Sequence, residues 1–315
     1  MRDQNIDLGE NSMAHIDFPT DFPSLETMMS VLKKVFEKSW KIDLDIEDIN
    51  IWLENFNGKF FDVEQERRLA LWLLCNFTYY NDAEINHLCS ILFKKFVHAL
   101  MTDYELTSSE EVEACIGALK FTSIGRPSES GGLILYHFRQ EARLSTDCFV
   151  FPTSIAATKS DIIVCIDDVI MSGGTAQRFF YDNEERFKNK KIYYLTILTT
   201  NKAISKLNDL NIQVISCAVL DERNRAFSEE SLCFFKYPAL KEPAKIISEG
   251  YGKIIEPKKP LGHRDGQYCF GFSYNIPNNS LPIFWSSSNG WKPIFYRKEK
   301  YQNAKQAKRE YDFFI

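Results

Sequence analysis

Two adjacent carboxylates and a small glycine-rich turn follow one another within residues 162–175, IIVCIDDVIMSGGT. Asp167 and Asp168 close an apolar run that is typical of a strand buried on both faces. The turn that follows consists of Met171, Ser172, Gly173, Gly174 and Thr175. Glycines let backbone N–H groups approach an anion closely, and the helix predicted from Ala176 adds unpaired donors at its positive end. The order of these residue types favours a site for a phosphorylated sugar.

Each polar group of the segment has a chemical role in such a site. The Ser172 and Thr175 hydroxyls can donate hydrogen bonds to phosphate oxygens. Asp167 and Asp168 can accept hydrogen bonds from ribose hydroxyls, directly or around a magnesium ion. The alternative is an ordinary strand–turn–helix with a glycine turn. The occurrence of all the features in order and in register weighs against that alternative.

The segment resembles the phosphoribosyl-diphosphate (PRPP) motif of type I phosphoribosyltransferases. That motif has an apolar strand, two acidic residues, two aliphatic residues and Thr-Thr-Gly-Gly-Thr. Met171 and Ser172 stand in place of the first two threonines, so one side-chain donor is lost and one hydroxyl is kept. The resemblance implies that residues 171–175 hold the ribose 5′-phosphate. It also implies that Asp167 and Asp168 are catalytic, hold the ribose hydroxyls and contact Mg²⁺.

A second loop, at residues 123–132, also lies between a predicted strand and a predicted helix. By the same resemblance, it occupies the place of the family's diphosphate loop. Its candidate diphosphate-binding residues are Ser123, Gly125, Arg126, Ser128, Ser130 and Gly131. The alternative is a solvent loop capped by Ser130. The long flexible loop of many family members has no clear match, because the connection at 152–161 is short.

The predicted secondary structure changes at about residue 118, from helices alone to alternating strands and helices. Strands are predicted near 118–123, at 148–154 and from 162, followed by KIYYLTILTT and IQVISCAVL, and helices lie between them, including one at 133–144. This alternation predicts an α/β fold with a mainly parallel sheet, of the type I phosphoribosyltransferase type by resemblance. Ligands bind at the carboxyl ends of strands in such sheets, where the Asp167–Thr175 loop is expected.

The flanking regions complete the predicted domain organisation. In the N-terminal part, Ser24 is predicted to cap a first helix. A later helix is predicted to run to residue 81, and Asp82 is the predicted cap of the helix after it. The predicted parts are an extended arm at 1–23, a helical domain at 24–117, an α/β core at 118–240, a C-terminal aromatic and proline-rich extension completing the core at 241–297, and a basic helix at 298–315.

Composition indicates in which compartment the protein works and which classes of partner are disfavoured. The net charge is −5, so no global basic field attracts the chain to nucleic acid or an anionic membrane. Eight cysteines form no C-x-x-C pair, which disfavours a disulfide framework or a zinc site and indicates a reducing cytoplasm. The polar, acidic start does not have the pattern of a signal or transit peptide, and no apolar run is long enough for a membrane span.

The C-terminal third carries a second resemblance. Pro260-Leu261-Gly262, Asn275-Ile276-Pro277-Asn278-Asn279 and Pro282-Ile283-Phe284-Trp285 resemble the tail of a bacterial phosphoribosyltransferase-like subfamily. That subfamily is encoded beside conflict and antiviral systems, including some retrons. The resemblance implies a role in defence and a protein or ribonucleoprotein partner encoded nearby. Asn275, Asn278 and Trp285 are interpreted as buried turn and packing residues, with contact to a base or sugar as the alternative. Residues expected to contact a base, by family position, are Asp221, Arg223 and Arg225, with a solvated charge cluster as an equal alternative.

Three functions remain open at this point. The first is an enzyme that binds PRPP or a nucleotide and transfers or cleaves at the ribose anomeric carbon. The second is a non-catalytic module that senses PRPP or a nucleotide and regulates a partner, with a homo-oligomer open in either case. The third is nucleotide salvage, against which the large helical region and the aromatic tail weigh.

Overall fold

The computed structural model describes residues 15–125 and 130–296, and the chain divides into two compact units. One of them, the sheet unit, runs from Tyr80 to Asn224. The other, the aromatic unit, combines the chain before Tyr80 with the chain from Arg225 onward. The arm predicted at 1–23 is described only from residue 15, and the helix predicted at 298–315 lies outside the described residues.

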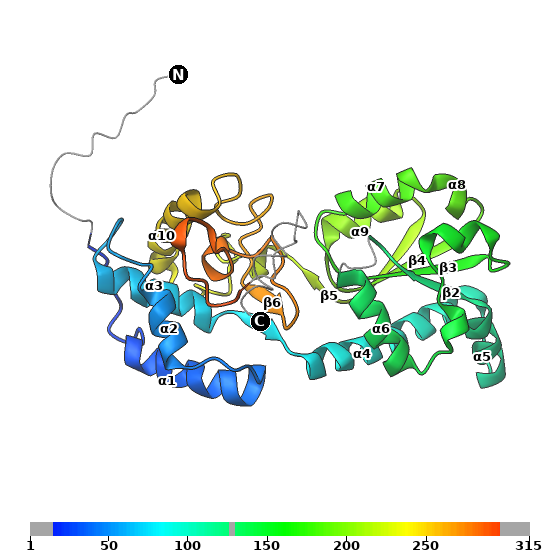
Figure 1. The fold of residues 1–315 in the computed structure, drawn as a ribbon, viewed down its shortest axis with the longest axis horizontal. Helices are drawn as coiled ribbons and strands as arrows, with labels where there is room; N and C mark the ends of the chain where they lie inside the picture. The colour runs from blue at the N-terminus through cyan, green and yellow to red at the C-terminus, as the bar shows by residue number, and fades with distance from the viewer. Residues whose placement is uncertain (1–14, 126–129, 297–315) are drawn as a thin grey trace, which may run out of the picture. The chain divides into compact units, whose positions relative to one another are not determined.

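In the sheet unit, helices cover both faces of a parallel sheet (Figure 1). Its helices are α4 (Asp82–Tyr104), α5 (Ser109–Ala118), α6 (Ser130–Ala142), α7 (Gly174–Asp182), α8 (Glu184–Phe187) and α9 (Asn201–Asn208). Its strands are β2 (Lys120–Ser123), β3 (Ile162–Ile170), β4 (Lys191–Thr200) and β5 (Ile212–Leu220). The strand order is β2–β3–β4–β5, with every neighbouring pair parallel. The predicted α/β class with a mainly parallel sheet is confirmed.

The chain changes its direction of progress across the sheet between β2 and β3. Phe149 forms a parallel bridge with Phe121, and the Val150 N–H donates to the Phe121 carbonyl at 2.9 Å. Since β3 occupies the other edge of β2, this segment lies outside β2, and the chain must pass back across β2 to enter β3. Such a reversal is a topological switch point, where open α/β sheets place their ligands.

The second strand predicted at 148–154 is reduced to that single bridge. Pro152 ends the extended segment, as predicted, and begins a 3₁₀ turn, Pro152–Ala157. Proline lacks the N–H that a ladder needs, and its fixed φ suits the first turn of a helix. Ile155 in this turn is fully buried, so the connection is packed against the unit.

The two faces of the sheet carry different side chains because residues alternate along each strand. One face is covered by α4 and α6, where Phe96, Phe121 and Phe138 form a ring cluster with Tyr193. The opposite face is covered by α7, α8 and α9, and its buried cluster includes Cys165 of β3 and Tyr194 of β4. Figure 1 shows these helices on opposite sides of the strands.

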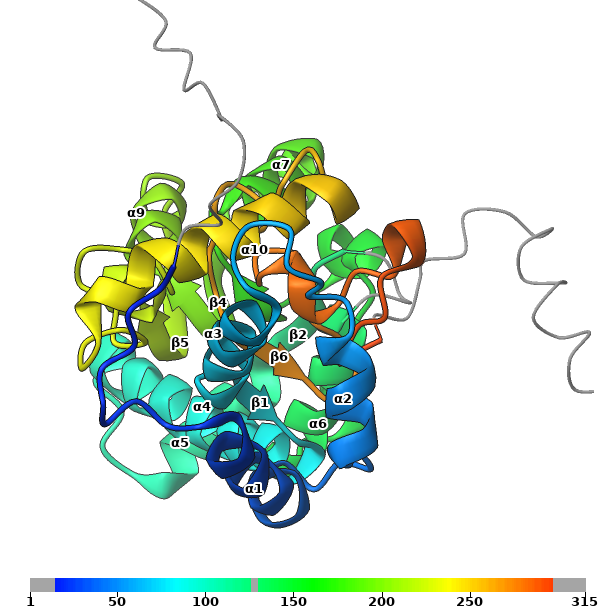
Figure 2. The same ribbon diagram turned by 90° about the vertical axis from the view of Figure 1, so that its left-hand side faces the viewer.

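The aromatic unit joins the two ends of the chain in one core. It contains α1 (Leu25–Val35), α2 (Ile46–Leu53), α3 (Val63–Cys75), α10 (Lys241–Ile255), and a small sheet of β1 (Thr78–Tyr80) and β6 (Phe270–Phe272). The Trp52 and Trp291 indole N–H groups both donate to the Ile283 carbonyl, at 2.8 and 3.0 Å. Helix α10 crosses over α3 (Figure 2). Gly250 lets α10 pack against the ring of Phe60, in the loop before α3, because a Cβ there would lie 2.2 Å from that ring.

These units differ from the predicted domain boundaries. Helices α4 and α5, expected in a helical domain at 24–117, belong to the sheet unit, where α4 contacts β4 and β5. The extension at 241–297, expected to complete the α/β core, packs with the N-terminal helices instead. Helical periodicity marks an apolar face but does not say which surface covers it, so the boundary could not be placed by pattern alone.

The helix ends follow local capping chemistry. Ser24 is the N-cap of α1, as predicted, and its side chain accepts from the Thr27 N–H at 3.2 Å. The predicted cap at Asp82 is wrong, because Asn81 accepts from the Glu84 N–H at 3.0 Å and caps α4. The preceding helix also ends earlier than predicted, at Cys75, because the chain at 78–80 enters β1.

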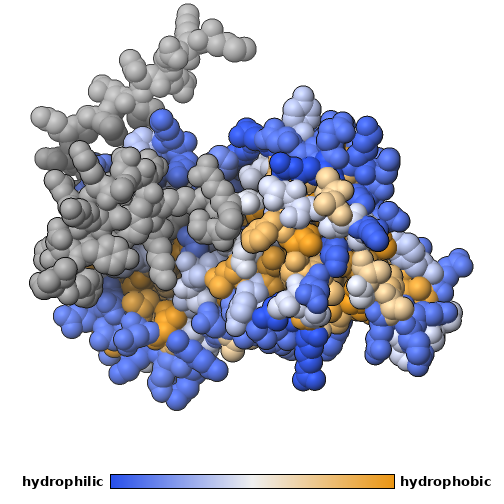
Figure 3. Space-filling model, turned by 45° about the vertical axis from the view of Figure 1, so that its right-hand side comes forward, coloured by the Kyte–Doolittle hydropathy of each residue, from blue (hydrophilic) through white to orange (hydrophobic). Residues whose placement is uncertain are grey.

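None of the described helices is both long enough and apolar enough to cross a membrane. Apolar side chains nevertheless reach the surface of the sheet unit. Tyr136 on α6 is 55% exposed, and Phe151 beside the switch-point connection is 70% exposed. Figure 3 shows apolar surface between polar side chains on one face of the molecule.

Candidate functional site

The acidic pair lies inside the last part of β3, before the strand ends at Ile170. Asp168 is buried and Asp167 is partly exposed. The Asp168 N–H donates to Asp167 Oδ1 at 3.0 Å, and the Val169 N–H donates to Asp168 Oδ1 at 2.8 Å. Backbone donors therefore hold both carboxylates at the carboxyl end of the strand next to the switch point.

The glycine turn leads directly from β3 into α7. Gly173 is the N-cap of α7 with φ of 67°, a left-handed conformation that glycine adopts without steric cost. No side chain caps this helix, and its first turn contains no acidic residue. The Ser172 hydroxyl accepts from the Gly174 N–H at a long 3.4 Å. The turn thus presents backbone donors at a helix N-terminus, the arrangement that suits an anion.

The start of α6 lies beside the acidic pair. Helix α6 begins at Ser130, three residues before its predicted start, so Ser130 and Gly131 belong to its first turn. A Cβ on Gly131 would lie 3.3 Å from Asp167 Oδ1 and 2.8 Å from the Ile124 carbonyl. The structure therefore brings the end of the second loop and the carboxylates together, although they are 36 residues apart in the chain, 167 minus 131.

The other residues of the second loop divide into two groups. Ser123 ends β2 next to Ile166 of β3, and Gly125 follows with φ of 95°. Arg126 and Ser128 lie outside the described residues. The described part of the loop is thus at the carboxyl ends of β2 and β3, on the same edge as the glycine turn.

Burial dominates the electrostatics of Asp167. It raises the pKa of Asp167 well above its usual range, and the nearby charge of Asp168 raises that pKa further. The Tyr194 hydroxyl opposes the shift by donating to Asp167 Oδ2 at 3.0 Å. Burial also raises the pKa of Tyr194, so its hydroxyl keeps the proton that it donates.

Two threonines at the end of β4 hold the backbone of the turn. The Thr199 hydroxyl donates to the Ile170 carbonyl at 3.0 Å, and the Thr200 hydroxyl donates to the Met171 carbonyl at 2.5 Å. We did not predict a role for Tyr194 or these threonines from the sequence. The signal for the threonines was present in KIYYLTILTT, as hydroxyl groups at the carboxyl end of a mostly apolar strand, whereas Tyr194 lies in the first half of that strand.

The residues expected to contact a base fall on both sides of the boundary between the two units. Asp221 and Arg223 follow the end of β5 and pair with each other, Arg223 Nη2 lying 2.7 Å from Asp221 Oδ2. The Arg223 side chain is 61% exposed, as a solvated charge cluster would be. Arg225 belongs to the aromatic unit, where it pairs with Asp265 at 3.1 Å. Arg225 thus belongs to a different unit from Asp221 and Arg223.

Magnesium is implied by the resemblance, and the donor set suits only partial coordination by protein. Among the residues that the structure describes, no cluster of three or more His, Cys, Asp or Glu side chains could hold a metal ion. Mg²⁺ commonly binds through one or two carboxylates and completes its shell with water and substrate phosphates. Asp167 and Asp168 fit that mode, since both carboxylates lie at the edge where a phosphorylated ligand would enter.

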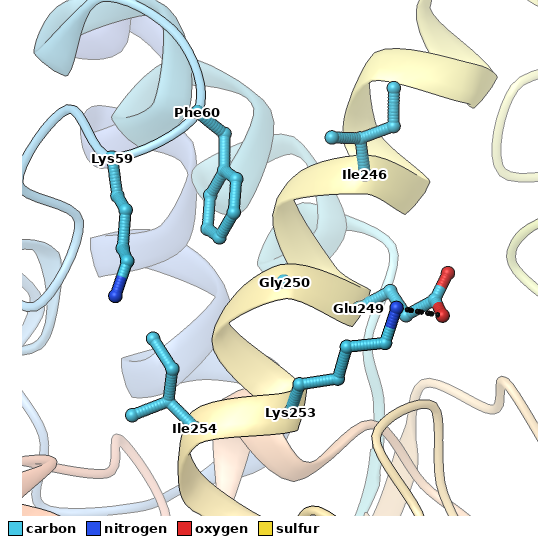
Figure 4. A pocket seen from close by; sticks show the side chains of 7 residues that line it. All are labelled: Lys59, Phe60, Ile246, Glu249, Gly250, Lys253 and Ile254. Carbon is cyan, nitrogen blue, oxygen red and sulfur yellow. Dashed lines mark ion pairs between the residues drawn. The ribbon is translucent and has the colours of Figure 1, made fainter. Parts of the chain in front are cut away.

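A pocket of about 390 Å³ lies in the aromatic unit between the 59–60 loop and α10 (Figure 4). It is lined by Lys59, Phe60, Ile246, Glu249, Gly250, Lys253 and Ile254. Lys253 is paired with Glu249 at 2.7 Å. None of the predicted site residues lines it. We assign it no function.

Comparison with known proteins assigns most of this chain to one family. The model of the PRTase-CE family, PRTase being the abbreviation for phosphoribosyltransferase, matches residues 49–297. The chain is similar to the crystal structure of orotate phosphoribosyltransferase from Aeropyrum pernix, at 11% identity over 36% of this chain and 72% of that chain. The TM-score of that pair is 0.23, so this likeness carries no argument. No curated protein matches the chain.

Proposed function

The chain belongs to the PRTase-CE family, and on that premise we propose that its sheet unit binds PRPP or a nucleotide and acts at the ribose anomeric carbon. The observation that carries the proposal is the approach of Gly131 to Asp167, with a Cβ-to-oxygen separation of 3.3 Å for an added methyl group. This approach brings the glycine turn, the second loop and the acidic pair to one switch point. A ligand with a 5′-phosphate at one end and a diphosphate at the other needs binding groups for both ends.

Each part of the site has a role in this proposal. The backbone N–H groups of residues 171–175 bind the 5′-phosphate, because the uncapped start of α7 supplies donors and a positive dipole end. The loop at 123–131 binds the diphosphate, or the part of a nucleotide beyond the anomeric carbon. Asp167 and Asp168 accept hydrogen bonds from the ribose hydroxyls and would hold Mg²⁺ together with the ligand.

The chemistry follows from this placement. When the bond between the anomeric carbon and its leaving group breaks, positive charge develops on the ring and negative charge on the group that leaves. Carboxylates beside the ring and donors beside the leaving group offset these charges, so the protein contributes mainly position and electrostatics. Mg²⁺ would neutralise the leaving diphosphate. The acceptor is a free base, water or a group on a macromolecule.

Calorimetry with PRPP and Mg²⁺, followed by mass spectrometry of the nucleotide pool in cells that express the chain, tests the proposal. We expect binding by the wild type, a changed nucleotide or base in the pool, and neither effect in the Asp167→Asn/Asp168→Asn double variant. The double variant must retain the wild-type circular dichroism spectrum. Unchanged behaviour of a folded double variant would refute the proposal.

A second candidate function is a non-catalytic sensor of PRPP or a nucleotide. The observation that favours it is the connection before β3, which is the short 3₁₀ turn Pro152–Ala157 with Ile155 buried rather than a free loop. Met171 also offers no hydroxyl to the phosphate. Binding of PRPP without conversion of any nucleotide or base would select the sensor over the enzyme.

We also propose that the site serves bacterial antiviral defence in the cytoplasm, with a protein or ribonucleoprotein partner encoded nearby. This is supported by the resemblance of the 260–285 tail to a subfamily found beside antiviral systems, including retrons. We expect the chain to be toxic when expressed alone and silent when expressed with its genomic neighbours. Equal growth of both strains, with the protein present in both, would contradict the toxin interpretation. Size-exclusion chromatography would show whether the chain forms a homo-oligomer.

A further inference from the structure

The proposed phosphate turn packs on the side chain of a lysine from another element. A Cβ built on Gly173 would lie 3.2 Å from Lys206 Cδ and 3.5 Å from Ala203 Cα, both on α9. The backbone of the turn therefore rests against the aliphatic stem of Lys206. The ammonium group is two bonds beyond Cδ on a flexible stem, within reach of a ligand bound at the start of α7.

Helix α9 and the turn are held together from a second side. Thr200 is the N-cap of α9, where its hydroxyl oxygen accepts from the Ala203 N–H at 3.2 Å. The same hydroxyl donates to the Met171 carbonyl at 2.5 Å. One side chain thus fixes both the start of the lysine-bearing helix and the start of the phosphate turn, which keeps Lys206 beside the turn.

The phosphate turn has no side chain with a full positive charge, which Lys206 can supply. Residues 162–175 contain two carboxylates and no lysine or arginine, so the motif itself adds only negative charge next to a phosphate dianion. Backbone donors and a helix dipole provide partial charges only. Among the described residues, Lys206 forms no hydrogen bond or ion pair, so its ammonium is available. A lysine ammonium is a compact point charge suited to phosphate.

We propose that Lys206 is a binding residue for the 5′-phosphate of a phosphorylated pentose, supplying the full positive charge that the 171–175 turn lacks. This inference rests on the proposed function and deepens it. It also accounts for Met171, because a cation from α9 replaces the side-chain donor that the turn has lost.

Calorimetry on the full chain with Mg²⁺ tests the inference with three ligands: ribose 5-phosphate, PRPP and pyrophosphate. The Lys206→Met variant should bind ribose 5-phosphate and PRPP at least about tenfold more weakly, the loss of one charge-assisted hydrogen bond. Its affinity for pyrophosphate, which has no 5′-phosphate, should stay within about twofold of wild type. Pyrophosphate therefore serves as a folding control inside the same variant.

Two further variants sharpen the result. Lys206→Arg keeps the charge and should retain PRPP affinity within about threefold. Lys188→Met removes a lysine from the opposite end of β4, where the side chain is 65% exposed, and should bind all three ligands as wild type does.

The outcomes separate this inference from the function on which it rests. Wild-type binding together with unchanged ribose 5-phosphate affinity in Lys206→Met would overturn the role of Lys206 and leave the proposed function standing. An equal loss for pyrophosphate would also overturn it, because the lysine would then support the fold rather than the phosphate. Failure of the wild type to bind any of the three ligands would overturn both.

Discussion

The Tyr194 hydroxyl donates a 3.0 Å hydrogen bond to Asp167 Oδ2 across the boundary between β4 and β3. Tyr194 is buried, and its register partner Cys165 places its ring two residues before the aspartate on the same face. A tyrosine of the core therefore fixes one oxygen of a carboxylate that is central to the proposed site. Asp167 is oriented before any ligand arrives, which is the condition for efficient binding.

Removing that hydroxyl should weaken the ligand site and leave the fold intact. In Tyr194→Phe, the ring still fills its place but Asp167 loses a fixed donor, so we expect about tenfold weaker PRPP binding, the value of one hydrogen bond to a charged group. The free energy of unfolding should change by less than about 2 kcal/mol. Calorimetry and urea unfolding measure these two quantities.

Tyr193→Phe is the matched control. The Tyr193 side chain faces the other side of the sheet and donates to Asp103 at 2.6 Å. Its loss removes a similar hydrogen bond with no contact to the acidic pair, so PRPP affinity should not change. Equal weakening of PRPP binding in both variants would show that the effect is general loosening of β4.

Neutralising Asp167 should stabilise the ligand-free chain while weakening ligand binding. The folded-state pKa of Asp167 is raised by burial and by Asp168, so the stability from its protonated form is present below the unfolded pKa. That stability is lost as the pH rises through the folded pKa. The midpoint temperature of Asp167→Asn should therefore exceed that of wild type by an amount that grows from about pH 4 to about pH 8. Thermal scans by circular dichroism across this range measure it.

A constant or shrinking difference between the two midpoint temperatures over that range would contradict the expected sign of this pH dependence. The same variant should bind PRPP at least about tenfold more weakly, because a charged acceptor of ribose hydroxyls becomes an amide. Stability then rises while affinity falls, as expected where a buried charge destabilises the ligand-free fold but is needed for binding.

Gly131 should not tolerate a methyl group. A Cβ would lie 2.8 Å from the Ile124 carbonyl, a distance that forces the start of α6 to shift away from β2. We expect Gly131→Ala to cost about 1 to 3 kcal/mol of stability and to weaken PRPP binding, because the shift separates the second loop from Asp167. Urea unfolding and calorimetry give both values.

Gly117→Ala provides the reverse case in the same unit. A Cβ there would meet nothing within 4 Å in α5, so alanine should stabilise the chain by about 0.5 to 1 kcal/mol through helix propensity. PRPP binding should stay as in wild type. Stabilisation by both alanine variants would mean that the close approach at Gly131 is not a constraint.

Glu66 should be the most sensitive polar residue of the aromatic unit. It is fully buried, and its carboxylate accepts from the Gly58, Phe60 and Phe61 N–H groups and from the Tyr251 hydroxyl at 2.6 Å. Glu66→Ala leaves the three backbone donors without this partner, while the Tyr251 hydroxyl can still donate to Asn57 Oδ1 at 3.1 Å, so we expect a loss of about 3 to 5 kcal/mol. Tyr251→Phe removes one donor to Glu66 and the hydroxyl that accepts from the Asn57 N–H at 2.9 Å, so it should cost less, about 1 to 2 kcal/mol.

Tryptophan fluorescence during urea unfolding measures the stability that the aromatic unit loses in Glu66→Ala. All five tryptophans lie before Tyr80 or after Arg225, so the signal reports the aromatic unit alone. A fluorescence transition that Glu66→Ala leaves at the wild-type urea concentration would disprove the role of this carboxylate. PRPP binding by the sheet unit at low urea serves as a check on its fold.

The sequence by itself determined the type and order of the secondary-structure elements in the sheet unit. The run 162–175 predicted a strand, an acidic pair, a glycine turn and a helix in that order, and β3 and α7 lie there. Alternation of strands and helices predicted a parallel sheet, because each parallel connection needs a crossover. These inferences depend on neighbours within a few residues, so the chain alone carries them.

Only the tertiary structure decided which distant groups meet. Nothing local indicates that Gly131 lies against Asp167, that Tyr194 donates to the same carboxylate, or that the stem of Lys206 supports the turn. Those contacts arise from strand order and register. Similarly, the helical pattern of α4 did not reveal that the sheet covers its apolar face, nor did the sequence place Arg225 in the other unit. Periodicity specifies the type of an element and its buried side, whereas the partner of that side depends on the packing of the whole chain.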